Sequence, residues 1–107
     1  MNINIIAAGK IREKYISLGI DEFMKRLAPY SPVKVVEVDS ESKILGRIKG
    51  NPYVIVLEIS GKSMSSEEFA EKLREISLSG VNEVVFIIGG AEGLPQEVKN
   101  AANLLLS

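Results

Sequence analysis

Short apolar runs alternate along the chain with stretches of helical periodicity, and this alternation restricts the possible folds more than any other feature. Four runs are expected to be strands, namely Ile3–Ala8, Val33–Val38, Tyr53–Ile59 and Glu83–Ile88. Most of them are apolar at successive positions, so both faces of each strand would be buried. The sequence therefore predicts an α/β fold in which helices cover both faces of a mostly parallel sheet, in the order β-α-β-(α)-β-α-β-α.

Helical patterns fill the intervals between these runs. A helix over Arg12–Leu27 is expected because apolar residues recur there at helical spacing, and residues 40–50 hold at most two or three further turns. The next helix should begin with a capping box, with Ser65 at the N-cap and Glu68 at N3. Gly80 stands where a glycine commonly ends a helix.

The last helix is predicted to begin with Pro95 at its first position, which suits proline. Its buried face would consist of Val98, Ala101, Ala102 and Leu105. The three leucines at 104–106 cannot all face the core from one helix, and natural chain ends are usually polar. We therefore expect the natural polypeptide to continue beyond Ser107. The alternative is an apolar end that packs on a partner subunit.

Length and composition exclude several classes of protein. A chain of 107 residues predicts one domain, residues 1–107. It contains neither Cys nor His, so it lacks thiolate and imidazole chemistry, and no metal site is predicted. Its net charge of −1 means that any contact with nucleic acid needs a local basic patch. No apolar run is long enough to span a membrane and no signal peptide is recognisable, which predicts a soluble, cytoplasmic protein.

Three glycines follow the most apolar strand in the stretch IGGAEGLP. In open α/β sheets, ligands bind beyond the carboxyl ends of the strands, where this turn lies. Gly89, Gly90 and Gly93 would leave backbone N–H groups uncovered next to a helix N-terminus, which favours an anion or another hydrogen-bond acceptor. Their spacing matches neither the dinucleotide-binding fingerprint nor a Walker A loop. A tight structural turn and a ligand site are both open interpretations.

Charged residues beside the predicted strand ends are further candidates. Lys62, in an expected loop over residues 60–64, could project a cation at the same edge, and Glu58 must reach the loop or find a donor. The basic segment GKIREKY, with Tyr15 and Tyr30 as stacking surfaces, could contact an RNA backbone. For each group, an ordinary solvated or structural role is the alternative.

Three segments together resemble one known family. INIIAAGKIREKY, VLEISGKSMSSEEFA and VVFIIGGAEGLPQEV occur in the order and spacing of the RlmH family. These proteins are pseudouridine N3-methyltransferases of large-subunit (23S) ribosomal RNA and belong to the SPOUT superfamily. The resemblance covers essentially the whole chain, although the stretch between Val38 and Pro52 is shorter than usual for the family.

The resemblance implies a function and a cofactor. Family members are homodimers with a trefoil-knotted C-terminal part, bind S-adenosylmethionine in loops of the knot, and methylate a pseudouridine in helix 69 within the assembled ribosome or large subunit. By position, Leu57 and Gly90 match cofactor-contact residues, and Gly89 and Gly93 shape the same turn. No catalytic residue is assigned, and no metal or membrane is implied.

The resemblance also implies a segment that this sequence lacks. In the family, the helix before Ser107 leads into a further cofactor loop, another strand and helix, and a tail with aromatic and His residues. We therefore expect a SPOUT-like domain without its C-terminal knot segment. Two alternatives to an active methyltransferase are a non-enzymatic module that binds a ligand or a subunit, and an inactive truncated relative.

Overall fold

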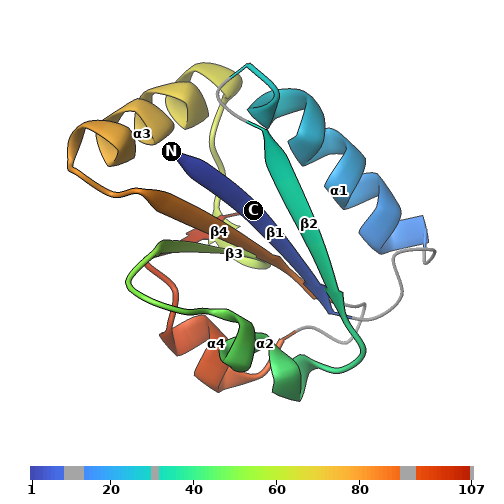
Figure 1. Ribbon diagram of the computed structural model, residues 1–107. Helices are drawn as coiled ribbons and strands as arrows, with labels where there is room; N and C mark the ends of the chain where they lie inside the picture. Colours follow the sequence, from blue (N-terminus) through green and yellow to red (C-terminus); the bar gives the residue numbers. More distant parts are fainter. Residues whose placement is uncertain (9–13, 30–31, 90–93, 107) are drawn as a thin grey trace.

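The protein consists of a five-stranded parallel sheet between two layers of helices (Figure 1). The computed structural model describes residues 1–8, 14–29, 32–89 and 94–106. Its elements are β1 Asn2–Ala8, α1 Lys14–Leu27, β2 Val33–Val38, the 3₁₀ helix η1 Glu41–Lys43, α2 Ile44–Arg47, β3 Tyr53–Lys62, α3 Ser66–Leu78, β4 Glu83–Ile88, α4 Gln96–Asn100 and β5 Leu104–Leu106. The α/β fold with helices on both faces is therefore confirmed.

The strands lie in the order β2-β1-β4-β3-β5, and every neighbouring pair is parallel. β4 is the central strand, β1 pairs with both β2 and β4, and β5 forms an edge beside β3. Helices α1 and α3 cover one face, and α2 and α4 cover the other (Figure 1). This arrangement explains why the strands are apolar at successive positions, because both faces of the sheet are covered.

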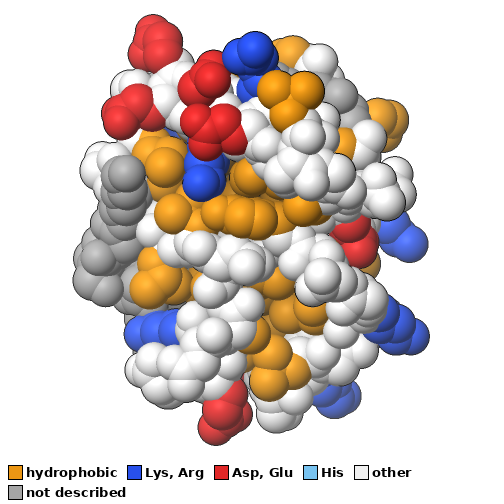
Figure 2. Space-filling view, turned by 90° about the vertical axis from the view of Figure 1, so that its left-hand side faces the viewer, with side chains coloured by type: hydrophobic (Ala, Val, Ile, Leu, Met, Phe, Trp, Pro, Cys, Tyr) orange, Lys and Arg blue, Asp and Glu red, His pale blue; other side chains and the backbone are white. Residues whose placement is uncertain are grey.

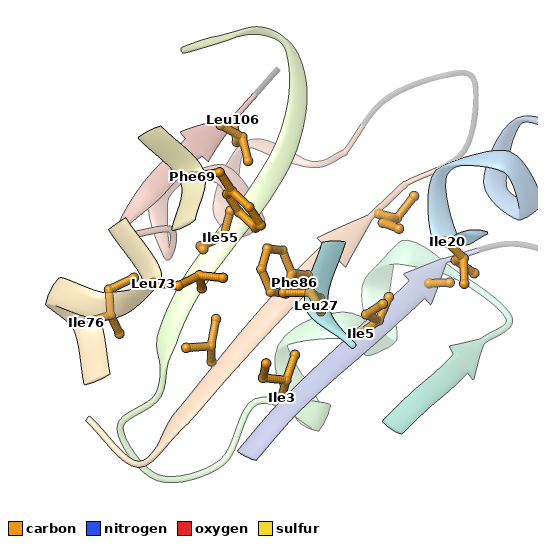
Figure 3. Packing of buried hydrophobic residues seen from close by; sticks show 13 residues of the cluster. Ile3, Ile5, Ile20, Leu27, Ile55, Phe69, Leu73, Ile76, Phe86 and Leu106 are labelled. Atoms are coloured by element: carbon orange, nitrogen blue, oxygen red, sulfur yellow. The ribbon is translucent and has the colours of Figure 1, made fainter. Parts of the chain in front are cut away.

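Alternate residues of each strand contribute to two separate cores. The larger core, between the sheet and helices α1 and α3, consists of Ile3, Ile5, Ala7, Ile20, Leu27, Ile55, Phe69, Leu73, Ile76, Val84, Phe86, Ile88 and Leu106 (Figure 3). The rings of Phe69 and Phe86 meet with centroids 6.1 Å apart at an interplanar angle of 56°. Tilted aromatic pairs of this kind contribute about 0.5–1.5 kcal/mol beyond their buried area.

Helix α3 begins and ends as local sequence chemistry predicts. The Ser65 hydroxyl accepts a hydrogen bond from the Glu68 N–H at 3.1 Å, and the Glu68 carboxylate accepts one from the Ser65 N–H at 3.0 Å. These bonds form the predicted capping box. At the other end Gly80 has a φ of 91°, a left-handed conformation that glycine adopts without steric cost.

The prediction of a helix through Leu105 is wrong. α4 ends at Asn100, and the three leucines form β5 instead. Two hydrogen bonds at Asn103 bring about the change: its N–H donates to the Val54 carbonyl at 2.7 Å, and its side-chain oxygen accepts from the Val54 N–H at 2.8 Å. In the extended chain Leu104 and Leu106 face the larger core, whereas Leu105 packs against the other core.

Two boundaries also differ from expectation. Pro95 is the N-cap of α4 rather than its first helical residue. The expected loop over residues 60–64 is partly strand, because β3 continues to Lys62 and pairs there with Leu106. No helix within the described ranges is long and apolar enough to cross a membrane.

Candidate functional site

Two of the residues predicted to line a ligand site lie on neighbouring strands: Leu57 lies where the pairing of β3 with β4 ends, and Gly89 directly follows β4. Val56 of β3 aligns with Ile87 of β4, so Leu57 and Gly89 follow the last aligned pair at the same edge of the sheet. This is the edge at which open α/β sheets bind ligands. The structure thus brings together two of the four predicted site residues, while Gly90 and Gly93 lie outside the described residues.

Gly89 is buried, and its missing side chain leaves room for a leucine. A Cβ atom at this position would lie 2.6 Å from both Cγ and Cδ2 of Leu94. Such a distance is far below the contact of two carbon atoms at ~3.5–4.0 Å. The φ of Gly89 is outside the left-handed region, so the position requires a residue without a side chain rather than a special backbone conformation.

Leu94 holds the returning end of the turn. It is buried in the second core, together with Ile87 of β4 and Val98 of α4. Leu94 therefore packs directly on Gly89, at the end of the strand that precedes it in the sequence. Sequence analysis did not single out Leu94. The sequence pattern that could have indicated Leu94 is an apolar residue between a glycine-rich turn and a helix.

Leu57 lies where β3 changes its pairing with β5. Both Leu57 and Lys62 align with Leu106, so the ladder is irregular between them. The Leu57 side chain is half-buried and packs against the larger core. It therefore presents part of an apolar side chain at the sheet edge, beside the start of the glycine turn.

Comparison with known proteins identifies the family. The family model described as "Predicted SPOUT methyltransferase" matches residues 1–107. The chain belongs to the SPOUT methyltransferase family. It is 44% identical to the ribosomal RNA large subunit methyltransferase H of Clostridioides difficile (strain 630) and 42% identical to that of Halothermothrix orenii. It is 39% identical to the putative ribosomal RNA large subunit methyltransferase H of Methanococcus vannielii, and each comparison covers all of this chain and 79% of the relative.

The SPOUT relatives contain residues that have no counterpart here. The alignment with the Clostridioides difficile protein extends over 126 positions, more than the 107 residues of this chain. In this chain, the connection between β2 and β3 holds only the three residues of η1 and the four of α2 as helix.

Several residues that the sequence suggests as candidates for function lie outside the described part of the structure. The side chains of Glu58, Lys62 and Tyr15 lie outside the part of the chain that the structure describes, as do the whole residues Lys10 and Tyr30. Within the described ranges, no group of three acidic side chains is arranged to hold a metal ion. The geometry on which a functional conclusion can rest is therefore the Leu57–Gly89 edge and the turn that Leu94 closes.

Proposed function

We propose that this protein transfers a methyl group from S-adenosylmethionine to large-subunit ribosomal RNA, at N3 of a pseudouridine in helix 69. The single observation that carries the proposal is the match of the family model to the whole chain. The printed names of the relatives supply the substrate class. In the same proposal the chain is one SPOUT-like domain of residues 1–107, which acts as a cytoplasmic homodimer on the assembled ribosome or large subunit.

The described residues at the sheet edge fit a cofactor with an adenine ring. Leu57 is half-buried and presents apolar surface there, against which a flat ring can pack. Gly89 contacts Leu94, so its part is to shape the turn, and we assign direct contact with the cofactor to Leu57 and Gly90. Gly93 belongs to the same turn. These four residues form the proposed cofactor site.

Bound S-adenosylmethionine would supply an electrophilic methyl group on sulfur. The chain must then hold the acceptor nitrogen in line with that group, exclude water and allow N3 to lose its proton. The packing of Leu94 on Gly89 fixes the direction in which the turn leaves β4. We assign the chain's contribution to this positioning and name no catalytic base.

The test is methyl transfer to large ribosomal subunits from a strain without this modification. With methyl-labelled S-adenosylmethionine, we expect label in the ribosomal RNA at a single pseudouridine, located by nuclease digestion and mass spectrometry. Label at another nucleotide would overturn the assignment of the target. Absence of label, in a preparation that binds the subunit, would favour the non-enzymatic binding module instead.

A substitution in the turn separates cofactor binding from folding. Gly90→Val adds a branched side chain at a position assigned to the cofactor, so we expect loss of S-adenosylmethionine binding in titration calorimetry. The circular dichroism spectrum should be unchanged. Ala101→Val, at an exposed position beyond α4, is the matched control and should bind as the parent protein does. Parental affinity in the Gly90→Val protein would remove the turn from the pocket.

A further inference from the structure

A groove with a volume of about 380 Å³ opens over the sheet. It lies away from the edge with Leu57 and Gly89, which we call the cofactor edge. Its floor is formed by residues near the amino ends of three adjacent strands: Asn4 of β1, Lys34 of β2 and Glu83 of β4. Asn4 aligns with Lys34 on β2 and with Val85 on β4, two residues beyond Glu83, so all three lie on the same face of the sheet. Ile6, Val36 and Val85 add apolar walls.

The groove exists because the helices on this face are short. α2 and α4 have four and five residues, and each contributes one buried residue, Ile44 and Val98, to the second core. That core includes Ala8, Val38 and Ile87, which lie toward the carboxyl ends of their strands. On the opposite face α1 and α3 have 14 and 13 residues. The amino ends of the strands are therefore left open on one side only.

Three cations from separate parts of the chain converge on this groove. Lys34 comes from β2, Arg47 from α2 and Lys49 from the loop that follows. All three are exposed, and none of them makes an ion pair with another residue that the structure describes. Glu83 is the one acidic residue among those that line the groove, so the three cations outnumber it and favour a bound anion.

Several cations elsewhere on the protein have acidic partners. Lys43 lies 2.9 Å from a carboxylate oxygen of Asp39 and, as hydrogen-bond donor and cation, lowers the pKa of that carboxyl. Arg74 similarly lies 3.5 Å from Glu71 on α3. Acidic side chains gather over α3, at the top of the view in Figure 2, where Glu67, Glu68, Glu71 and Glu75 are exposed. The three groove cations thus lie on the face of the sheet opposite α3 and its acidic surface (Figure 1).

The groove also contains one carboxylate with a defined partner. The Asn4 amide donates a hydrogen bond to Glu83. A carboxylate accepts hydrogen bonds only, so Glu83 suits a ligand that carries O–H or N–H donors as well as negative charge. Free phosphate has far fewer hydrogen-bond donors than a nucleotide, whose 2′-hydroxyl and base amino groups are donors.

We propose that this groove binds the phosphodiester backbone of a single RNA strand. Lys34, Arg47 and Lys49 contact phosphates, and the Asn4–Glu83 pair receives a ribose hydroxyl or a base amino group. The choice of RNA as partner rests on the proposed function. Glu83 and Gly89 are six residues apart along β4, or about 20 Å at the usual strand rise, so a bound strand of several nucleotides reaches from the groove to the cofactor edge.

The test measures binding of a fluorescein-labelled, uridine-rich RNA of about 12 nucleotides by fluorescence anisotropy, without cofactor. The triple variant Lys34→Gln, Arg47→Gln and Lys49→Gln should bind about tenfold more weakly. Its slope of log affinity against log salt should fall by about 2, because each lost phosphate contact on a single strand removes ~0.7. All three side chains are exposed, so the substitutions should leave the fold intact. Circular dichroism checks this.

A matched control removes the same charge outside the groove. Lys25→Gln, Lys72→Gln and Arg74→Gln, on the helices of the opposite face, together should change affinity by less than about twofold, because charges far from the bound strand are screened. An equal loss in both triple variants would mean only a net-charge effect and would overturn the proposal. No measurable binding by the parent protein at low salt would overturn it as well.

Two further outcomes separate the partner classes and the two proposals. The first is a competition experiment with a polyglutamate peptide that matches the charge of the RNA. If this peptide displaces the labelled RNA as effectively as unlabelled RNA does, the groove binds an acidic protein and our proposal is wrong. If the groove triple variant loses RNA binding while the parent protein transfers no methyl group, the groove assignment stands and only the proposed function fails. If the parent protein methylates ribosomal RNA and the groove triple variant binds RNA normally, the proposed function stands and only the groove assignment fails.

Discussion

At the scale of single residues, Gly89 is, among the glycines that the structure describes, the one at which an added Cβ atom would clash. Its importance lies in the space that its missing side chain leaves, since Leu94 occupies the volume that a Cβ atom would fill. Leu94 in turn is buried in the second core. The glycine and the leucine therefore form one packing unit, and a change at either position alters the requirement at the other.

This unit predicts non-additive substitutions. Gly89→Ala forces Leu94 to move and should lower the free energy of unfolding by about 1–3 kcal/mol, as overpacking does. Leu94→Ala should cost about 2–4 kcal/mol through the cavity that it leaves. In the double variant the new methyl group enters that cavity, so the total cost should be at least ~1 kcal/mol less than the sum. Urea denaturation of the three variants measures this coupling.

The control for that cycle is Gly46→Ala, because a Cβ atom at Gly46 would meet nothing within 4 Å. Gly46→Ala combined with Leu94→Ala should give strictly additive effects on the free energy of unfolding. Additivity in the Gly89 cycle would mean that Leu94 adapts to the alanine without cost.

At the scale of elements, the chain from α4 to β5 is controlled by Asn103. It ends the helical segment by bonding to both backbone groups of Val54, and the leucines after it alternate between the two cores. A strand can place successive side chains on opposite faces, whereas one helix face cannot hold three consecutive leucines. The third core leucine, Leu106, then joins the edge of the sheet to the packing around Phe69.

Removing the side-chain acceptor should loosen β5. Asn103→Ala leaves the part-buried Val54 N–H without its partner, and we expect a loss of about 1–2 kcal/mol in the free energy of unfolding. Asn103→Asp keeps an acceptor oxygen and should retain most of that stability at neutral pH. Hydrogen exchange at the Val54 amide should accelerate in the alanine variant alone. Unchanged exchange there would show that the backbone pairing suffices.

Local chemistry made some elements predictable and left others hidden. The capping box of α3 depends on Ser65 and Glu68, three residues apart, so sequence alone indicates it. β5 depends on hydrogen bonds to Val54, which is 49 residues from Asn103, and its local sequence of alanines and leucines favours a helix. A partner so distant in sequence leaves no local pattern.

At the scale of the whole molecule, the two halves of the strands have different proposed roles. The carboxyl ends carry the Leu57–Gly89 edge, and the amino ends carry the groove of Lys34, Arg47 and Lys49. Sequence analysis placed the glycine turn at the first edge because strand and turn are contiguous. It could not assemble the groove, since its three cations come together only through the strand order and the shortness of α2.

The position of β1 between β2 and β4 has a consequence for biosynthesis. β1 leaves the ribosome first, yet its partner β4 begins only at Glu83, which aligns with Asn2. At translation rates of ~5–20 residues per second, the wait is roughly 4–16 s. Throughout that time an apolar strand lacks one neighbour and is open to proteases and chaperones. Nascent chains arrested before β4 should be cleaved readily, whereas chains arrested once β4 has emerged should resist, so pulse proteolysis can time the closure of the sheet.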